Sequence, residues 1–187
     1  MFLFSYLSYS QVNNFALANK EMNDKNYVKA EEYYLLAMAE EPFNYNIVSY
    51  YAYCKHKQLK YSEADSLLKI SINKDSTNAM SFWFRGLNYV KLKKDSLAVN
   101  AFKKFIKIEK VKGANTILAY KNVGAAYQRE LKSNGLYKWQ VEDMIYHYEQ
   151  VERLEPSDQD IPNIQNFIEI IKSQMPVTFT GKWKAVF

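Results

Sequence analysis

Residues 79–102 read AMSFWFRGLNYVKLKKDSLAVNAF, and this stretch contains the pattern that decides the fold. The small residue Gly86 precedes Ala98 by 12 positions, and the large apolar Phe102 follows Ala98 by four. The same arrangement of small residue, alanine and large residue occurs 34 and 68 positions earlier, as Ala52, Ala64, Leu68 and as Ala18, Ala30, Tyr34. Three features that keep one phase indicate a repeated unit of 34 residues, and an internal repeat takes priority over other interpretations.

Each unit has the apolar spacing of two helices joined by a short turn. In the first unit, apolar side chains recur at three- to four-residue intervals over 11–23 and over 27–40, with Asp24 and Lys25 between them. Between the predicted helices lie residues that cap helix N-termini, namely Asn44, Asp75, Ser76 and Asn78. Small residues let helices cross closely, and the large residue after each alanine fills the space beside the crossing. Because one helix pair leaves an apolar face uncovered, successive pairs must stack.

This pattern resembles the tetratricopeptide repeat, whose 34-residue signature is W-x2-L-G-x2-Y…A-x3-F…P. The third unit matches it at Phe82, Gly86, Tyr89, Ala98 and Phe102. A fourth copy reads Tyr120, Val123-Gly124 and Tyr127, followed by Tyr148 and Pro156. The departures from the signature are Arg85 in place of an apolar residue, Lys55 and Glu21 in place of tyrosines, and Lys110 and Ser76 in place of closing prolines.

The resemblance implies an all-α, right-handed superhelical solenoid of antiparallel helix pairs. We expect about four repeats, at 11–44, 45–78, 79–116 and 117–156, then a capping helix at 157–174 and an extended tail at 175–187. The residues that define these repeats structurally are Ala18, Ala30, Tyr34, Ala52, Ala64, Leu68, Gly86, Tyr89, Ala98, Phe102, Gly124, Tyr127 and Pro156.

Two insertions and the C-terminal tail depart from the repeat. Residues 111–114 lengthen the connection between the third and fourth units, and residues 132–137 lengthen the turn inside the fourth. Insertions in repeat arrays go to loops on one face, sometimes the binding face. After Pro176, alternating β-branched and aromatic residues predict a strand. A lone strand adds to the sheet edge of a partner or begins a further β domain; the alternative is a flexible tail.

The first ten residues, MFLFSYLSYS, form a short apolar stretch. It is too short for a membrane span, which needs about 20 apolar residues. Its small residues Ser8 and Ser10 are placed as in a signal cleavage site, although the usual basic segment before it is absent. We interpret it as a signal-peptide remnant, or alternatively as an N-terminal arm that packs on the first helix. The first interpretation predicts an exported protein, periplasmic or extracellular; the second predicts a cytoplasmic one.

The sequence lacks the groups that most catalytic and metal sites need. It has one cysteine, Cys54, and two histidines, His56 and His147. Cys54 and His56 are two positions apart on a predicted helix, so their side chains point in different directions. No phosphate-binding loop, nucleophile elbow or H-E-x-x-H motif is present. We therefore predict no enzyme activity, no cofactor and no metal.

In the repeat family, the first helix of each unit lines a concave groove that binds an extended peptide. Transfer of the groove positions by phase gives the candidate partner-binding residues Phe15, Asn19, Tyr53, His56, Lys57, Trp83, Leu87, Lys91, Lys121, Gln128 and Arg129. Tyr53 and Trp83 are the expected anchors, because aromatic residues dominate interaction hot spots. Some members grip a partner's C-terminal carboxylate with a basic clamp; here Phe15 stands where the clamp lysine is expected, which argues against that mode. The alternative is a shallow groove that the chain's own ends fill in part.

Charge is segregated along the chain, whose formal net charge is +5. Residues 91–112 contain eight lysines and two acids, whereas residues 141–160 contain seven acids and one arginine. The lysines are either a solubilising face or a patch that attracts an acidic partner or anionic headgroups. The sequence argues against nucleic-acid binding, because no arginine lies in the patch. Contact between the acidic end of one molecule and the basic middle of another would allow weak self-association.

We therefore predict a non-catalytic scaffold that binds a protein or peptide partner through its groove. The alternative is that the repeats are the N-terminal module of a larger exported protein, whose effector domain begins at the C-terminal strand.

Overall fold

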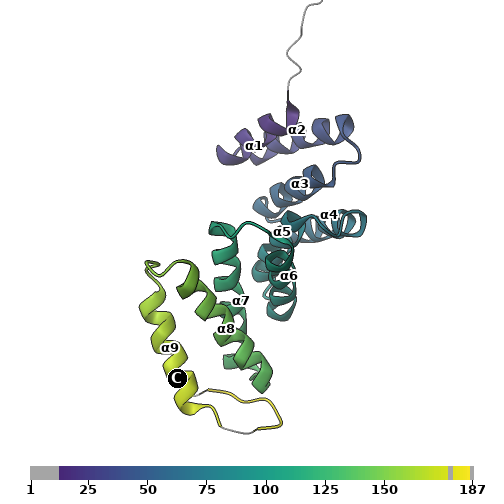
Figure 1. Cartoon of the computed structure of the whole chain (residues 1–187). Coiled ribbons are helices and arrows are strands. Elements are labelled where there is room, and N and C mark those ends of the chain that lie inside the picture. Colours follow the sequence, from purple (N-terminus) through teal and green to yellow (C-terminus); the bar gives the residue numbers. More distant parts are fainter. Residues whose placement is uncertain (1–12, 177–178, 186–187) are drawn as a thin grey trace, which may run out of the picture.

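The computed structural model describes residues 13–176 and 179–185, which contain nine α-helices (Figure 1). They are α1 (Asn14–Asn23), α2 (Tyr27–Glu40), α3 (Tyr45–Lys57), α4 (Tyr61–Lys74), α5 (Ala79–Lys91), α6 (Asp95–Ile108), α7 (Ala114–Ser133), α8 (Lys138–Leu154) and α9 (Ile161–Gln174). The predicted signal remnant or arm at 1–10 lies outside the described residues.

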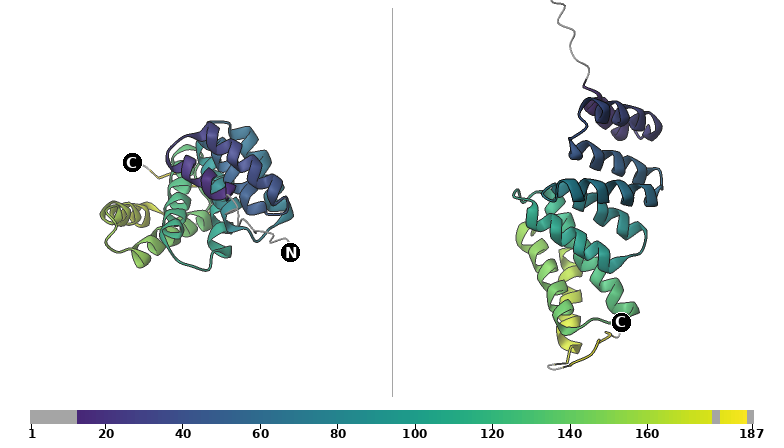
Figure 2. Two further views of the ribbon diagram at one scale, coloured as in Figure 1. Left: turned by 90° about the horizontal axis from the view of Figure 1, so that it is seen from above. Right: turned by 90° about the vertical axis from the view of Figure 1, so that its right-hand side faces the viewer.

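The helices form antiparallel pairs, α1–α2, α3–α4, α5–α6 and α7–α8, and each pair stacks on the next (Figures 1 and 2). The stack turns as it proceeds: α1 and α2 lie across the view of Figure 1, whereas α7 runs down it. The last helix, α9, packs on α8. This is the all-α solenoid that the 34-residue period predicts.

The repeat positions pack as the phase predicts. Ala98 and Phe102 are fully buried, as are their equivalents in the first two units. A Cβ atom on Gly86 would lie 2.6 Å from Cε1 of Phe102, and one on Gly124 would lie 2.5 Å from Cε1 of Tyr148. Only glycine therefore lets α5 approach the Phe102 ring on α6, and α7 approach the Tyr148 ring on α8.

The turns inside the first three units share one backbone geometry. Lys25, Leu59 and Lys93, spaced 34 residues apart, have positive φ angles of 62°, 64° and 54°. The following residue closes each turn onto the preceding helix; the Lys60 N–H, for example, donates to the Lys55 carbonyl oxygen at 3.0 Å. This is the Schellman ending of a helix, where glycine is the usual residue. In the fourth unit the residue with positive φ is a glycine, Gly135, at 75°. The next N–H there, that of Leu136, donates to the Trp183 carbonyl oxygen and not to the preceding helix.

Asparagine side chains begin three of the helices. The Oδ1 atoms of Asn44 and Asn78 accept hydrogen bonds from the backbone N–H groups of Asn46 and Ser81, as predicted. Asn13 caps α1 in the same way. Asp75 is not a cap; its carboxylate accepts from the N–H and hydroxyl of Thr77 and so holds the loop before α5.

The C-terminal tail folds back on the inserted turn of the fourth unit. The N–H of Leu136 donates to the carbonyl oxygen of Trp183 at 2.9 Å, and the N–H of Trp183 donates to that of Leu136 at 2.8 Å. Lys184 Nζ adds a hydrogen bond to the Ser133 carbonyl oxygen at 2.7 Å. The predicted strand is thus wrong for residues 179–185: they form a single antiparallel bridge with the chain's own turn, which occupies the backbone groups of Trp183.

Candidate functional site

One side of α1, α3, α5 and α7 carries the predicted groove residues, and we call it the first-helix surface. Three of them, Lys57, Lys91 and Arg129, are exposed. Those that are half-buried are Phe15, Asn19, Tyr53, Leu87, Lys121 and Gln128. The structure therefore keeps nine of the eleven predicted residues at least partly accessible.

Two predicted groove residues lie in the core instead. Trp83 is 6% exposed, and its ring packs on Phe102 and Phe105 of α6 at centroid distances of 5.5 and 5.2 Å. His56 is 7% exposed and hydrogen-bonds through Nδ1 to Oδ1 of Asn88 at 3.0 Å. The prediction that they line an open groove is wrong, because the repeat phase gives the side of the helix but not whether neighbouring helices cover it.

The first-helix surface is basic near the turns that join α3 to α4 and α5 to α6. Burial lowers the pKa of His56, and the charges of Lys57 and Lys91 lower it further, so both lysines lie close to this imidazole. Lys57 Nζ stands 5.6 Å from the ring centre of Tyr53, which in turn stacks on Phe84 at 4.4 Å. The exposed Arg129 differs, because it forms an ion pair with Asp95 at 2.6 Å.

At the N-terminal end, two predicted residues are held by contacts with α2 and α3. Oδ1 of Asn19 accepts a hydrogen bond from the Tyr34 hydroxyl at 2.7 Å. The Phe15 ring packs against Tyr34 and Tyr50. Their contacts are those of residues that join α1, α2 and α3.

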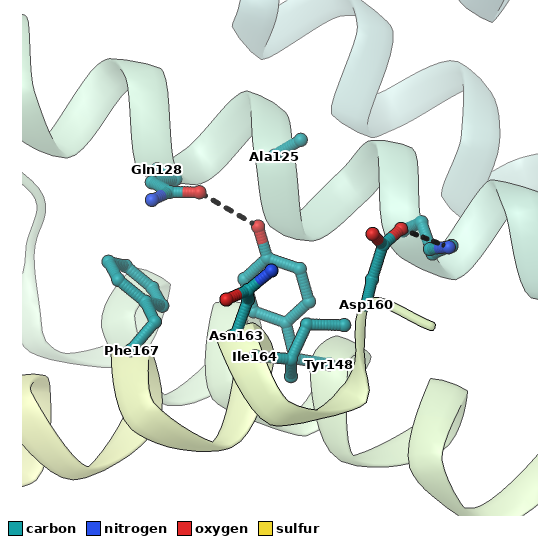
Figure 3. Close-up of a pocket in the computed structure, with 8 residues that line it drawn as sticks. Ala125, Gln128, Tyr148, Asp160, Asn163, Ile164 and Phe167 are labelled. Atoms are coloured by element: carbon teal, nitrogen blue, oxygen red, sulfur yellow. Dashed lines mark hydrogen bonds and ion pairs between the residues drawn. The ribbon is translucent and has the colours of Figure 1, made fainter. Parts of the chain in front are cut away.

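A pocket of about 250 Å³ opens where α7, α8 and α9 meet (Figure 3). Its walls are formed by Lys121, Ala125, Gln128, Tyr148, Asp160, Asn163, Ile164 and Phe167. Two of these, Lys121 and Gln128, are predicted groove residues, so the pocket continues the first-helix surface at its C-terminal end. The Tyr148 hydroxyl donates to Oε1 of Gln128 at 3.0 Å, and burial raises the pKa of Tyr148 to about 12.

An ion cluster forms one end of the pocket. Lys121 Nζ lies 2.9 Å from Oδ1 of Asp158 and 2.5 Å from Oδ2 of Asp160. Burial alone would lower the pKa of Lys121, but the hydrogen bonds with Asp160 and Asp158 raise it. Lys121 is therefore a cation, and two carboxylates share it.

α9 forms one wall of this site, in agreement with the alternative that the chain's own end fills part of the groove. The sequence alone did not indicate which side chains would meet there. Lys121 occupies the phase position of the buried residues Ser49 and Trp83 in earlier units. The sequence gives one signal for the ion cluster. It has a charged lysine where earlier units have buried residues, and two aspartates precede α9.

The described residues bring no catalytic set together. Cys54 Sγ contacts the Tyr27 carbonyl oxygen, whereas His56 faces Asn88. Burial raises the pKa of Cys54, which disfavours the thiolate. In the part of the chain that the structure describes, no three His, Cys, Asp or Glu residues gather as a metal site, and no helix has the length and apolar character to cross a bilayer.

Comparison with known proteins identifies the fold. No family model matches the sequence, and no curated protein matches it either. Among solved structures, a double mutant of MamA RS-1 has a TM-score of 0.68 at 14% identity and covers 86% of this chain and 84% of its own. A tetratricopeptide repeat protein from Parabacteroides merdae has a TM-score of 0.65 at 15% identity and covers 86% of this chain and 59% of its own.

A third similar structure is the first tetratricopeptide repeat domain of Spaghetti (RPAP3), bound to the HSP90 peptide SRMEEVD. Its TM-score is 0.52 at 19% identity, and the alignment covers 60% of this chain and 89% of that one. Together with the 34-residue period and the stacked helix pairs, these similarities show that the chain has the tetratricopeptide-repeat fold.

Proposed function

We propose that this protein is a non-catalytic scaffold that binds an extended segment of a partner protein on its first-helix surface. The observation that carries the proposal is the state of Leu87 and Lys91 on α5. Leu87 is half-buried and packs in part against the apolar core, and Lys91 is exposed and forms no ion pair within the described residues. The ammonium group of Lys91 and the exposed part of Leu87 are available to a partner.

The similar structures support this proposal at the level of the fold. One of them, the repeat domain of RPAP3, holds a peptide of HSP90. Asn19 occupies one position of the clamp that grips a carboxylate-terminated peptide, but its Oδ1 already accepts from the Tyr34 hydroxyl. Phe15 stands in place of the clamp lysine and packs into the helix stack. We therefore propose an internal segment of the partner as the ligand.

The test is affinity capture of partners from the native organism with the wild-type chain and the double variant Leu87→Asp, Lys91→Glu. The matched control is Leu97→Asp, Lys104→Glu, which makes the same changes at exposed residues of α6. We expect the α5 variant to lose the partner while circular dichroism stays helical, and the α6 variant to keep it. Retention by the α5 variant, or loss only with the α6 variant, contradicts the proposal.

Export remains part of the proposal and rests on residues 1–10 alone. N-terminal sequencing of secreted material tests it. We expect a mature chain that begins near Gln11, whereas a mature protein that begins at Met1 contradicts cleavage.

A further inference from the structure

The pocket between α7, α8 and α9 is large enough to hold one large amino-acid side chain. Its volume of about 250 Å³ is below the roughly 300–1,000 Å³ of pockets that bind drug-sized molecules or cofactors. The ring of Tyr148 and the side chains of Ala125, Ile164 and Phe167 give it an apolar floor. Such a floor gains most from a large aliphatic or aromatic group.

Two amide side chains flank this apolar floor. Gln128 uses its oxygen to accept from Tyr148, which leaves its two N–H groups without a partner in the described structure. Asn163 is exposed and stands on α9 beside the pocket (Figure 3). A side-chain amide can donate to a peptide carbonyl and accept from a peptide N–H, so these groups suit the backbone of an extended segment.

The mouth of the pocket carries excess negative charge. Lys121 is one cation shared by Asp158 and Asp160, and the Asp160 side chain is 47% exposed. Nearby Arg129 does not compensate, because it is paired with Asp95. The cluster therefore has a net charge of −1, and a positive charge beside the bound side chain would be attracted to Asp160.

From this geometry we infer that the pocket binds a large apolar side chain of a partner peptide next to a lysine or arginine. The apolar group contacts Ile164 and Phe167, the peptide backbone meets Gln128 and Asn163, and the basic neighbour faces Asp160. This inference rests on the proposed function, because the pocket is the C-terminal end of the same surface.

The test selects ligands for the full chain from a phage-displayed library of random twelve-residue peptides. We expect the enriched peptides to share a large apolar residue beside Lys or Arg. Ala125→Leu places an isobutyl group in the pocket and should weaken these peptides about tenfold or more. Ala39→Leu, at an exposed position of α2, is the matched control and should leave affinity unchanged.

A second pair of variants tests the contribution of the Asp160 carboxylate. Asp160→Asn should weaken the same peptides about three- to fivefold at low salt, as for an exposed ion pair, and the difference should vanish at high salt. Glu142→Gln removes a carboxylate that is 57% exposed on α8 and lies 4.0 Å from Lys138. It does not line the pocket and should leave affinity unchanged.

The outcomes separate this inference from the proposed function. The pocket inference is wrong if the enriched peptides lack the apolar–basic pair. It is also wrong if they bind the Ala125→Leu variant as well as the wild type but no longer bind the double variant Leu87→Asp, Lys91→Glu. In either case the proposed binding to the first-helix surface stands. If no peptide is enriched by the wild-type chain, both are contradicted. Methyl resonances of Ala125 and Ile164 that shift on addition of an enriched peptide place the ligand directly.

Discussion

At the residue scale, Gly86 shows how closely the two helices of a unit approach. The Phe102 ring that faces it is fully buried and cannot move aside without disturbing α6. In Gly86→Ala, overpacking lowers the free energy of unfolding by about 1–3 kcal/mol. The better helix propensity of alanine raises it by about 1 kcal/mol. We therefore expect a net loss of about 1 kcal/mol in the free energy of unfolding, measured by urea denaturation.

Gly181→Ala is the control for this substitution, because a Cβ there would have no neighbour within 4 Å. A Gly86→Ala protein that is as stable as the wild type would show that α5 and α6 are farther apart than the structure places them.

The three positive-φ turns predict a stabilising substitution. Leu59 has φ 64°, and its side chain is 70% exposed, so its removal sacrifices little burial. A non-glycine residue in this conformation costs about 1–2 kcal/mol. We expect Leu59→Gly to raise the free energy of unfolding by about 0.5–1 kcal/mol. Gln58→Gly, one residue earlier at φ −83°, should give no increase; an equal gain there would contradict the turn geometry.

At the element scale, the inserted turn of the fourth unit and the C-terminal tail hold each other in place through one backbone bridge. Gly135 permits the close approach, because a Cβ on it would lie 2.8 Å from the Trp183 carbonyl oxygen. Neither partner is recognisable alone: residues 136 and 183 are 47 positions apart, and one bridge leaves no periodic signal in the sequence.

This contact predicts a local change in hydrogen exchange. In Gly135→Ala, the Cβ clash and the positive φ of 75° should weaken the bridge, at a cost of about 1–2 kcal/mol. The Leu136 amide, which donates to Trp183, should then exchange about five- to thirtyfold faster. Amides of α3 to α5 should not change. Unchanged protection of Leu136 would mean that the tail does not hold this turn.

Comparison of the helices also shows which residue positions can be predicted from the sequence. The phase of the repeat correctly places Ala98, Phe102 and Gly86, because their environment is set within one helix pair. It fails for Trp83 and His56, whose burial depends on rings and amides from other helices. The repeat phase cannot predict the pocket, because the pocket depends on the position of α9 relative to α7.

At the scale of the whole molecule, most acids of the C-terminal end are used internally. Asp143 pairs with Lys103, Glu149 with Lys172, and Asp158 with Lys121, while the half-exposed Asp160 keeps the excess charge of its cluster. Self-association through this end would have to compete with these contacts, which leaves the lysines at 91–94 as the more available charges.

Among the residues that the structure describes, the core is divided into two apolar clusters of unequal size. The smaller one joins α1, α2 and α3 around Ala18, Tyr34 and Ile47, and it meets the larger one through the half-buried Tyr50 and Leu67. Because repeat stability is a sum of neighbour contacts, we expect α1 amides to open at a free energy roughly 1–3 kcal/mol below those of α6 in native-state hydrogen exchange. Equal protection in both helices would indicate one cooperative unit.

The central claim is that partners bind the first-helix surface, including the pocket at its C-terminal end, and not the exposed faces of α2, α4 and α6. The most direct measurement is NMR mapping of amide and methyl shifts when a captured partner or selected peptide is added. We predict that the shifts gather on Tyr53, Leu87, Lys91 and Gln128, on α3, α5 and α7. Shifts confined to exposed residues of α2, α4 and α6, such as Leu36, Ile70 and Leu97, would contradict it.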